Sequence, residues 1–92
     1  MLEKNIQQKI IAFLKSLDYN CHKMDSSSSV GWPDLIAVSP EGVVYFFEVK
    51  TETGRLSKMQ SRTIKKLRNN HANVAIVHSV EETLAFINRR TN

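Results

Sequence analysis

Two apolar runs separated by a three-residue turn constrain the fold of this chain more than any other feature. Residues 35–39 and 43–49 flank Pro40-Glu41-Gly42. Proline suits the first position of such a turn, and glycine suits the left-handed residue that closes a three-residue hairpin loop. The pattern therefore predicts a β-hairpin. Both faces of this hairpin are apolar, which predicts a sheet covered by helices on both sides.

Charged residues stand at the open end of the predicted hairpin. Counting outward from the turn places Asp34 directly opposite Glu48, and strand alternation puts Lys50 on the same face as Glu48. Like charges that face each other destabilise a sheet, so two facing carboxylates indicate a cation between them. Taken singly, Asp34 also fits a turn residue, and Lys50 also fits a residue that merely neutralises the two acids. Together the three predict a divalent metal held beside a phosphate.

The hydrophobic periodicity of the remaining segments predicts an α/β fold. We expect one domain over residues 1–92, with a mixed sheet flanked by helices in the order α-β-β-β-α-β-α. The expected elements are a helix at 2–17, a weak strand at 19–24, the hairpin strands, a helix at 56–70, a strand at 74–77 and a helix at 81–90.

Composition favours a polyanionic partner. The chain has 13 Lys and Arg against 9 Asp and Glu, a formal net charge of +4, and the basic residues gather in an acid-free stretch at 53–80. A domain this short buries only about 60–65% of its unfolded surface, so we also expect a homodimer. One cysteine, no apolar run of about 18 residues and no secretory profile predict a soluble protein of the reducing cytosol.

Two further polar residues lie within the apolar faces of predicted helices. Glu3 falls inside the apolar arc of the first helix, which favours a role at the site, although a first-turn glutamate also stabilises the helix dipole. Gln60 projects from the apolar face of the helix at 56–70, near its start. Its amide is expected to bond Lys50 or a bound phosphate, or alternatively to cap a backbone group.

Four residues are predicted to contact nucleic acid. Arg55, Lys58 and Arg62 lie near the start of the same helix and are the predicted contacts to a phosphate backbone, although basic residues more often form a solvated face. Trp32 is predicted to stack on a base; a half-buried core tryptophan is an equal alternative.

The order of these motifs resembles that of a known family. The matching groups are Glu3, residues 31–35, Glu48-Val49-Lys50 and residues 56–60. This order resembles the PD-(D/E)XK nuclease superfamily, and more closely its virus-type replication–repair nuclease (VRR-NUC) branch, over nearly the whole chain. The resemblance implies a restriction-endonuclease-like core. Because the branch includes stand-alone phage and bacterial domains, it also implies the cytosol of a bacterium or of a phage-infected host.

The resemblance also implies roles for individual residues. Asp34, Glu48 and the carbonyl of Val49 would bind Mg²⁺ or Mn²⁺. Lys50 would orient or activate the attacking water and steady the charged transition state. The catalytic residues implied in this way are Glu3, Asp34, Glu48, Lys50 and Gln60.

The favoured hypothesis is therefore a metal-dependent DNA endonuclease. Stand-alone members of the branch resemble Holliday-junction resolvases and are typically homodimers, which implies a branched DNA substrate in replication, repair or recombination. No Gly-rich phosphate loop is present, so we expect no nucleotide cofactor. One alternative is a catalytically inactive nucleic-acid-binding module, although such a binder gains nothing from two acids that face phosphate. Another is a small protein that binds a partner through a sheet edge or the last helix.

Overall fold

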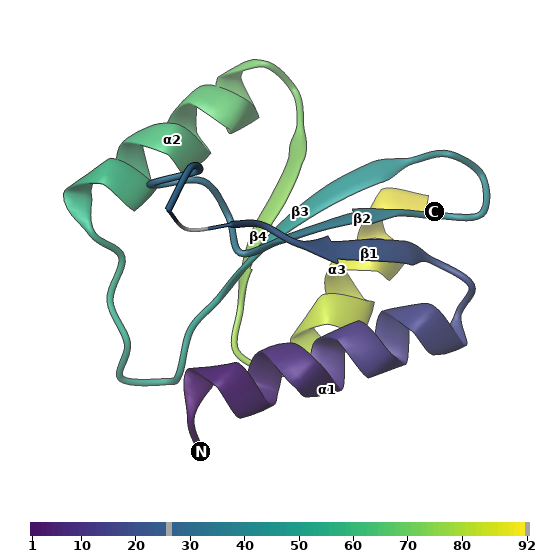
Figure 1. Cartoon of the computed structure of the whole chain (residues 1–92). Coiled ribbons are helices and arrows are strands. Elements are labelled where there is room, and N and C mark those ends of the chain that lie inside the picture. The colour runs from purple at the N-terminus through teal and green to yellow at the C-terminus, as the bar shows by residue number, and fades with distance from the viewer. Residues whose placement is uncertain (26, 92) are drawn as a thin grey trace.

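The computed structural model describes residues 1–25 and 27–91 and has the expected order of helices and strands (Figure 1). The elements are α1 (Glu3–Ser16), β1 (Asn20–Lys23), β2 (Leu35–Val38), β3 (Val44–Val49), α2 (Lys58–Asn69), β4 (Asn73–Val77) and α3 (Val80–Thr91). None of the helices within these described ranges has both the length and the apolar character needed to cross a membrane.

The β2–β3 hairpin has the predicted turn and the predicted register. Val38 pairs with Val44 and Leu35 with Phe47. The loop is closed by a hydrogen bond from the Ser39 amide to the Val43 carbonyl at 2.8 Å. Gly42 has a φ of 87°, the left-handed conformation for which glycine was expected at this position.

The four strands form one mixed sheet in the order β1-β2-β3-β4. The β1–β2 and β2–β3 pairs are antiparallel, and β3 pairs with β4 in parallel. Parallel neighbours need a crossover, and α2 supplies it. The expected fold class, a mixed sheet flanked by helices, is confirmed.

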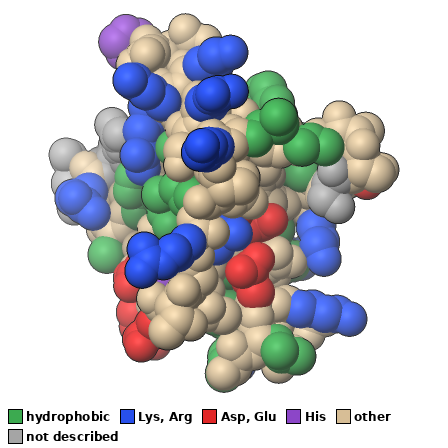
Figure 2. All heavy atoms as spheres, turned by 90° about the vertical axis from the view of Figure 1, so that its left-hand side faces the viewer, with side chains coloured by type: hydrophobic (Ala, Val, Ile, Leu, Met, Phe, Trp, Pro, Cys, Tyr) green, Lys and Arg blue, Asp and Glu red, His purple; other side chains and the backbone are tan. Residues whose placement is uncertain are grey.

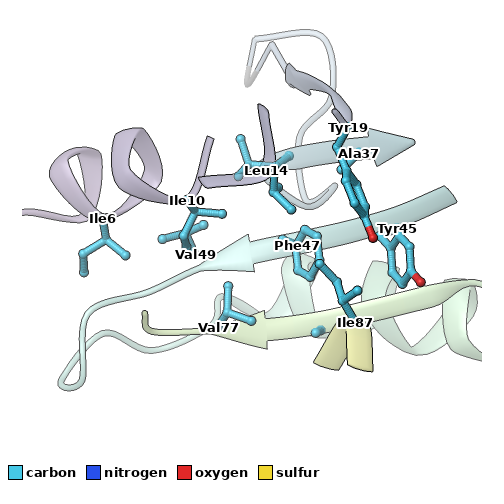
Figure 3. Close-up of a cluster of buried hydrophobic side chains, with 12 residues drawn as sticks. Ile6, Ile10, Leu14, Tyr19, Ala37, Tyr45, Phe47, Val49, Val77 and Ile87 are labelled. Atoms are coloured by element: carbon cyan, nitrogen blue, oxygen red, sulfur yellow. The ribbon is translucent and has the colours of Figure 1, made fainter. Parts of the chain in front are cut away.

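The main core lies between the sheet and the α1–α3 pair. Ile6, Ile10 and Leu14 recur along one face of α1 and pack against strand residues such as Phe47 and Val49 (Figure 3). This spacing of four residues explains why the segment folds as an amphipathic helix. The helix predicted at 2–17 was one residue too long at each end, and Leu2 and Leu17, which flank α1 at its two caps, are exposed.

The other face of the sheet carries α2, which covers this face only in part. The helix α2 packs chiefly over β4, and it buries Ile64 there. Toward β2 the cover is thinner, and Phe46 is only half-buried while Val44 is exposed. The uncovered part of this face ends at the open end of the hairpin.

Candidate functional site

The fold fixes Asp34 at the open end of the hairpin. Asp34 immediately precedes β2, one position beyond the Leu35–Phe47 pair, so it lies opposite Glu48 as the sequence predicted. The fully buried Pro33 precedes it. The Asp34 carbonyl accepts a hydrogen bond from the Met24 amide at 2.8 Å. The buried Pro33 and the hydrogen bond from Met24 therefore fix the backbone that carries this carboxylate.

The Asp34 carboxylate is tied to β3 by a backbone hydrogen bond. Its Oδ2 accepts from the Val49 amide at 2.8 Å. The next amide along, that of Lys50, donates in the opposite direction to the Val77 carbonyl of β4 at 3.0 Å. Backbone groups alternate in direction along a strand, so the Val49 carbonyl turns toward the Asp34 side together with its amide. This orientation suits Val49 as the third metal ligand, a role that remains a prediction.

Glu48 lies at the centre of the site, and its two oxygens have different surroundings. The residue is 0% exposed. Its Oε2 accepts a hydrogen bond from Gln60 Nε2 at 3.2 Å and lies 3.6 Å from Lys50 Nζ, whose side chain is 13% exposed. Its Oε1 is buried without any hydrogen-bond partner among the described residues. The protein therefore fixes Oε2 of Glu48 and leaves Oε1 able to accept a proton or to bind a ligand.

Burial, and secondarily the negative charge of Asp34, raise the pKa of Glu48 to about 7, while Lys50 acts in the opposite direction. Glu48 thus faces a second carboxylate, and neither of these groups can donate a hydrogen bond to the other when both are ionised. Only a proton or a cation satisfies both. Lys50 alone does not, because it approaches only the oxygen that Gln60 already holds.

The donor set at this position fits a hard divalent cation. Carboxylate and carbonyl oxygens with several waters are the ligands that Mg²⁺ prefers. Within the described part of the chain no group of three or more His, Cys, Asp or Glu side chains gathers. A cation here would be held by Asp34, Glu48, the Val49 carbonyl and water.

Gln60 reaches the site from the first turn of α2. Its side-chain Oε1 accepts a hydrogen bond from the Ser57 backbone amide at 2.8 Å, and the Gln60 backbone amide donates to Ser57 Oγ at 3.1 Å. The two bonds together form a capping box. Its Nε2 meanwhile bonds Glu48 rather than the expected Lys50. The capping alternative and the contact with the site are therefore both present. The Ser-x-x-Gln spacing was the sequence signal for this box and for a helix that starts at Lys58 rather than at residue 56.

Glu3 is not brought into contact with the two carboxylates. The helix α1 packs on the face of the sheet opposite to α2, and Glu3 is partly exposed at its start. Among the described residues no hydrogen bond or ion pair joins Glu3 to Asp34, Glu48 or Lys50. The first turn of α1 does lie at the same end of the sheet, since Met1 and Ile6 line a cavity together with the loop after β3. Its catalytic role remains a prediction.

The predicted phosphate contacts lie just before and within the first turns of α2, the helix that also carries Gln60. Arg55, Lys58 and Arg62 are all exposed, and none forms an ion pair within the described ranges. Figure 2 shows acidic side chains in the middle of this face with Lys and Arg side chains above and beside them. A polyanion drawn to the basic groups of this face would therefore lie close to acidic side chains (Figure 2).

Trp32 combines features of both of its predicted alternatives. Its ring makes an edge contact with Phe46, with centroids 6.0 Å apart and an interplanar angle of 62°. The residue is nevertheless 43% exposed. It packs on the partly covered face of the sheet without belonging to the buried core.

Comparison with known proteins agrees with the fold and with the motif order. A sequence model of the VRR-NUC domain family matches residues 1–81, which include Asp34 and Glu48. A solved structure described as a VRR-NUC domain is similar with 29% identity and a TM-score of 0.82, over 94% of each chain. A second, described as a VRR-NUC domain protein, has 16% identity and a TM-score of 0.77, over 97% of this chain and 87% of that one, and is similar in fold alone. No curated protein sequence matches.

Proposed function

This chain belongs to the VRR-NUC domain family, and from that premise we propose that it is a metal-dependent endonuclease that hydrolyses DNA phosphodiester bonds. The family is nuclease-related, which gives the reaction class. The cation, the DNA substrate and the residue roles are proposals that the geometry of the site supports.

The asymmetry of Glu48 is the observation that carries this proposal. Gln60 and Lys50 take one carboxylate oxygen, and the other is buried without a partner opposite Asp34. A purely structural glutamate at this depth would have donors for both oxygens, because buried polar groups are nearly always paired. A divalent cation between the two carboxylates accounts for the missing partner.

The protein residues around that position suit phosphodiester hydrolysis. A bound Mg²⁺ or Mn²⁺ would supply Lewis-acid polarisation of the scissile phosphate. The Val49 backbone amide fixes the orientation of the Asp34 carboxylate, and the Gln60 side-chain amide fixes that of Glu48. Lys50 places a positive charge beside them, where it would offset the negative charge that develops on the phosphate.

The surroundings of the site favour a nucleic-acid substrate. Arg55, Lys58 and Arg62 carry no partner charge within the described residues, so they are available to phosphates of the strand on either side of the scissile bond. We propose branched DNA as the preferred form and a homodimer as the active species, since resolving a four-way junction takes two cuts and a second copy would present a second site.

A cleavage assay tests the proposed function. The protein is incubated with a four-way junction, a flap, a nicked duplex, a plain duplex and a single strand, each with Mg²⁺, with Mn²⁺ or with chelator. We expect cleavage of at least one branched form with either metal and none with chelator. If the protein binds these DNAs and cuts none of them with either metal, it is the inactive binding module instead.

The substitution Gln60→Ala separates the capping role of this residue from its role at the site. Loss of the bond from the Ser57 amide to Gln60 Oε1, one half of the capping box, is expected to cost up to about 1 kcal/mol of stability, or roughly 5 °C in melting temperature. Loss of the hydrogen bond to Glu48 is expected to lower the cleavage rate about 10-fold. The matched control is Ser79→Ala, which removes one capping hydrogen bond from the start of α3, where Ser79 Oγ accepts from the Glu82 backbone amide at 3.1 Å. The control should lose similar stability and keep its cleavage rate; an equal loss of activity in both variants would show that Gln60 acts through stability alone.

A further inference from the structure

A small cavity shares a wall with the carboxylate site. Its volume is about 240 Å³, and its lining includes Val30, Trp32, Asp34 and Gln60. Asp34 belongs to the proposed cation site, and Gln60 bonds Glu48. A ligand in this cavity would therefore lie next to the phosphate being cut. Cavities for drug-sized ligands have roughly 300–1,000 Å³, so this one suits a single ring system and not a base pair.

The aromatic wall of the cavity is held in place before any ligand binds. The Trp32 ring makes its edge contact with Phe46 of β3. The Trp32 amide donates to the Ser29 carbonyl at 3.0 Å, which closes the turn that carries it. A rigid aromatic side chain loses little conformational entropy when a flat ligand stacks on it.

Gly31 anchors the same turn against α2. Its φ is 84°, and a Cβ at this position would lie 2.5 Å from Met59 Cγ and 3.2 Å from the Met59 carbonyl oxygen. The turn therefore sits directly on the first turns of α2. Three apolar side chains around this contact remain exposed: Val30 at 62%, Trp32 at 43% and Met59 at 50%. Such a cluster at the edge of a polar site marks a surface for an apolar or aromatic ligand.

We propose that this cavity takes one unpaired nucleobase of the strand being cut, stacked on Trp32, next to the phosphate at the Asp34–Glu48 site. This inference rests on the proposed function. Bases of an intact duplex are stacked inside the helix and cannot enter a side pocket, whereas an unpaired base turns outward at low cost. Stacking on an aromatic ring tolerates every base, because each has a π-face. The substrate class is therefore DNA with an unpaired nucleotide beside the scissile phosphate, as at a flap or a bulge.

Trp32 is the single tryptophan of the chain, so its fluorescence reports on the cavity without interference. The experiment uses the Glu48→Gln variant, so that DNA binds without being cut. Three DNAs are titrated: a plain duplex, the same duplex with a one-nucleotide bulge, and that bulged duplex with an abasic residue in the bulge. We expect quenching by the bulged duplex and little by the other two. Equal quenching by all three would overturn the proposal, because Trp32 would then contact the duplex surface only.

Affinities of labelled DNA for a Trp32→Ala variant complete the test. The bulge with a base is expected to bind the parent protein roughly 5- to 150-fold more tightly than the abasic bulge, and Trp32→Ala should abolish that difference. Trp32→Phe should keep part of it. The matched control is Leu84→Ala, which removes an exposed apolar side chain from α3 and should keep all of it. A difference that persists in Trp32→Ala would contradict the stacking role.

Two further outcomes are distinguishable. If circular dichroism shows that Trp32→Ala does not fold, Trp32→Leu replaces it, because leucine keeps the packing on Phe46 without an aromatic face. Because these titrations require no cleavage, a protein that binds the bulged base through Trp32 but cuts no DNA would refute the nuclease function and leave the nucleobase site standing.

Discussion

Replacing Glu48 by glutamine is expected to lower the rate of DNA cleavage by at least about 100-fold while leaving DNA affinity unchanged or higher. Glutamine has nearly the same shape, and its carbonyl oxygen can still accept the hydrogen bond from Gln60 Nε2. The negative charge beside Asp34 disappears, and with it one of the two carboxylates that would hold the cation. DNA affinity is not lowered, because the substitution removes the negative charge of Glu48, which repels phosphate.

Asp34→Asn should have the same effect as Glu48→Gln, since its side-chain oxygen can continue to accept from the Val49 amide. Glu81→Gln is the matched control, because it removes one negative charge from an exposed position on α3. Single-turnover cleavage with Mn²⁺ and binding of labelled DNA are measured for all three. Full cleavage by either site variant would remove the basis for the assigned chemistry.

In the absence of divalent metal, the free energy of unfolding is expected to fall as the pH rises from about 4.5 to about 7. Burial, and secondarily Asp34, raise the pKa of Glu48 from its ordinary value of 4.5 to about 7. Between these two values the folded protein binds more protons than the unfolded chain, so raising the pH removes a proton from Glu48 and destabilises the fold. The loss is complete about one pH unit above 7 and amounts to about 3 kcal/mol, or roughly 15 °C in melting temperature.

Thermal unfolding of the parent protein and of Glu48→Gln between pH 4.5 and 8.5, with chelator present, measures this effect. The variant should lack the decline and should melt at a higher temperature than the parent at pH 8. Asp25 and Glu82 do not obscure it, because their pKa values are lowered, by bonds to Ser27 and His78 respectively, and their contributions are lost only as the pH falls below the window. Parallel curves for the two proteins would mean that Glu48 is not the buried acid described here.

The hairpin and its register were predictable because they depend only on the turn residues and on the length of the loop. Proline and glycine at fixed turn positions determine the loop, and the loop length determines every pair outward to Asp34 and Glu48. The convergence of the two acids then follows by counting. The side chain of Lys50 also lies where alternation placed it, 3.6 Å from a Glu48 oxygen.

Contacts that depend on packing between elements were not predictable in the same way. The periodicity of α1 could not indicate that Leu2 and Leu17 lie beyond the region that the sheet covers. It also could not indicate that α1 packs on the face away from Asp34, which leaves Glu3 without a described contact to the carboxylates. For Gln60, the inward direction was predicted correctly, yet its bond to Glu48 rather than Lys50 depends on how deeply α2 approaches the end of β3.

Calorimetric titration of the metal-free protein with Mn²⁺ at pH 6.5, in two buffers of different ionisation enthalpy, tests the central claim most directly. Because Glu48 is partly protonated at that pH, a cation shared by Asp34 and Glu48 must displace its proton. We expect saturable binding with proton release in the parent protein, and binding at least about 10-fold weaker, without proton release, in Glu48→Gln. Equal affinity and equal proton release in both proteins would contradict the account.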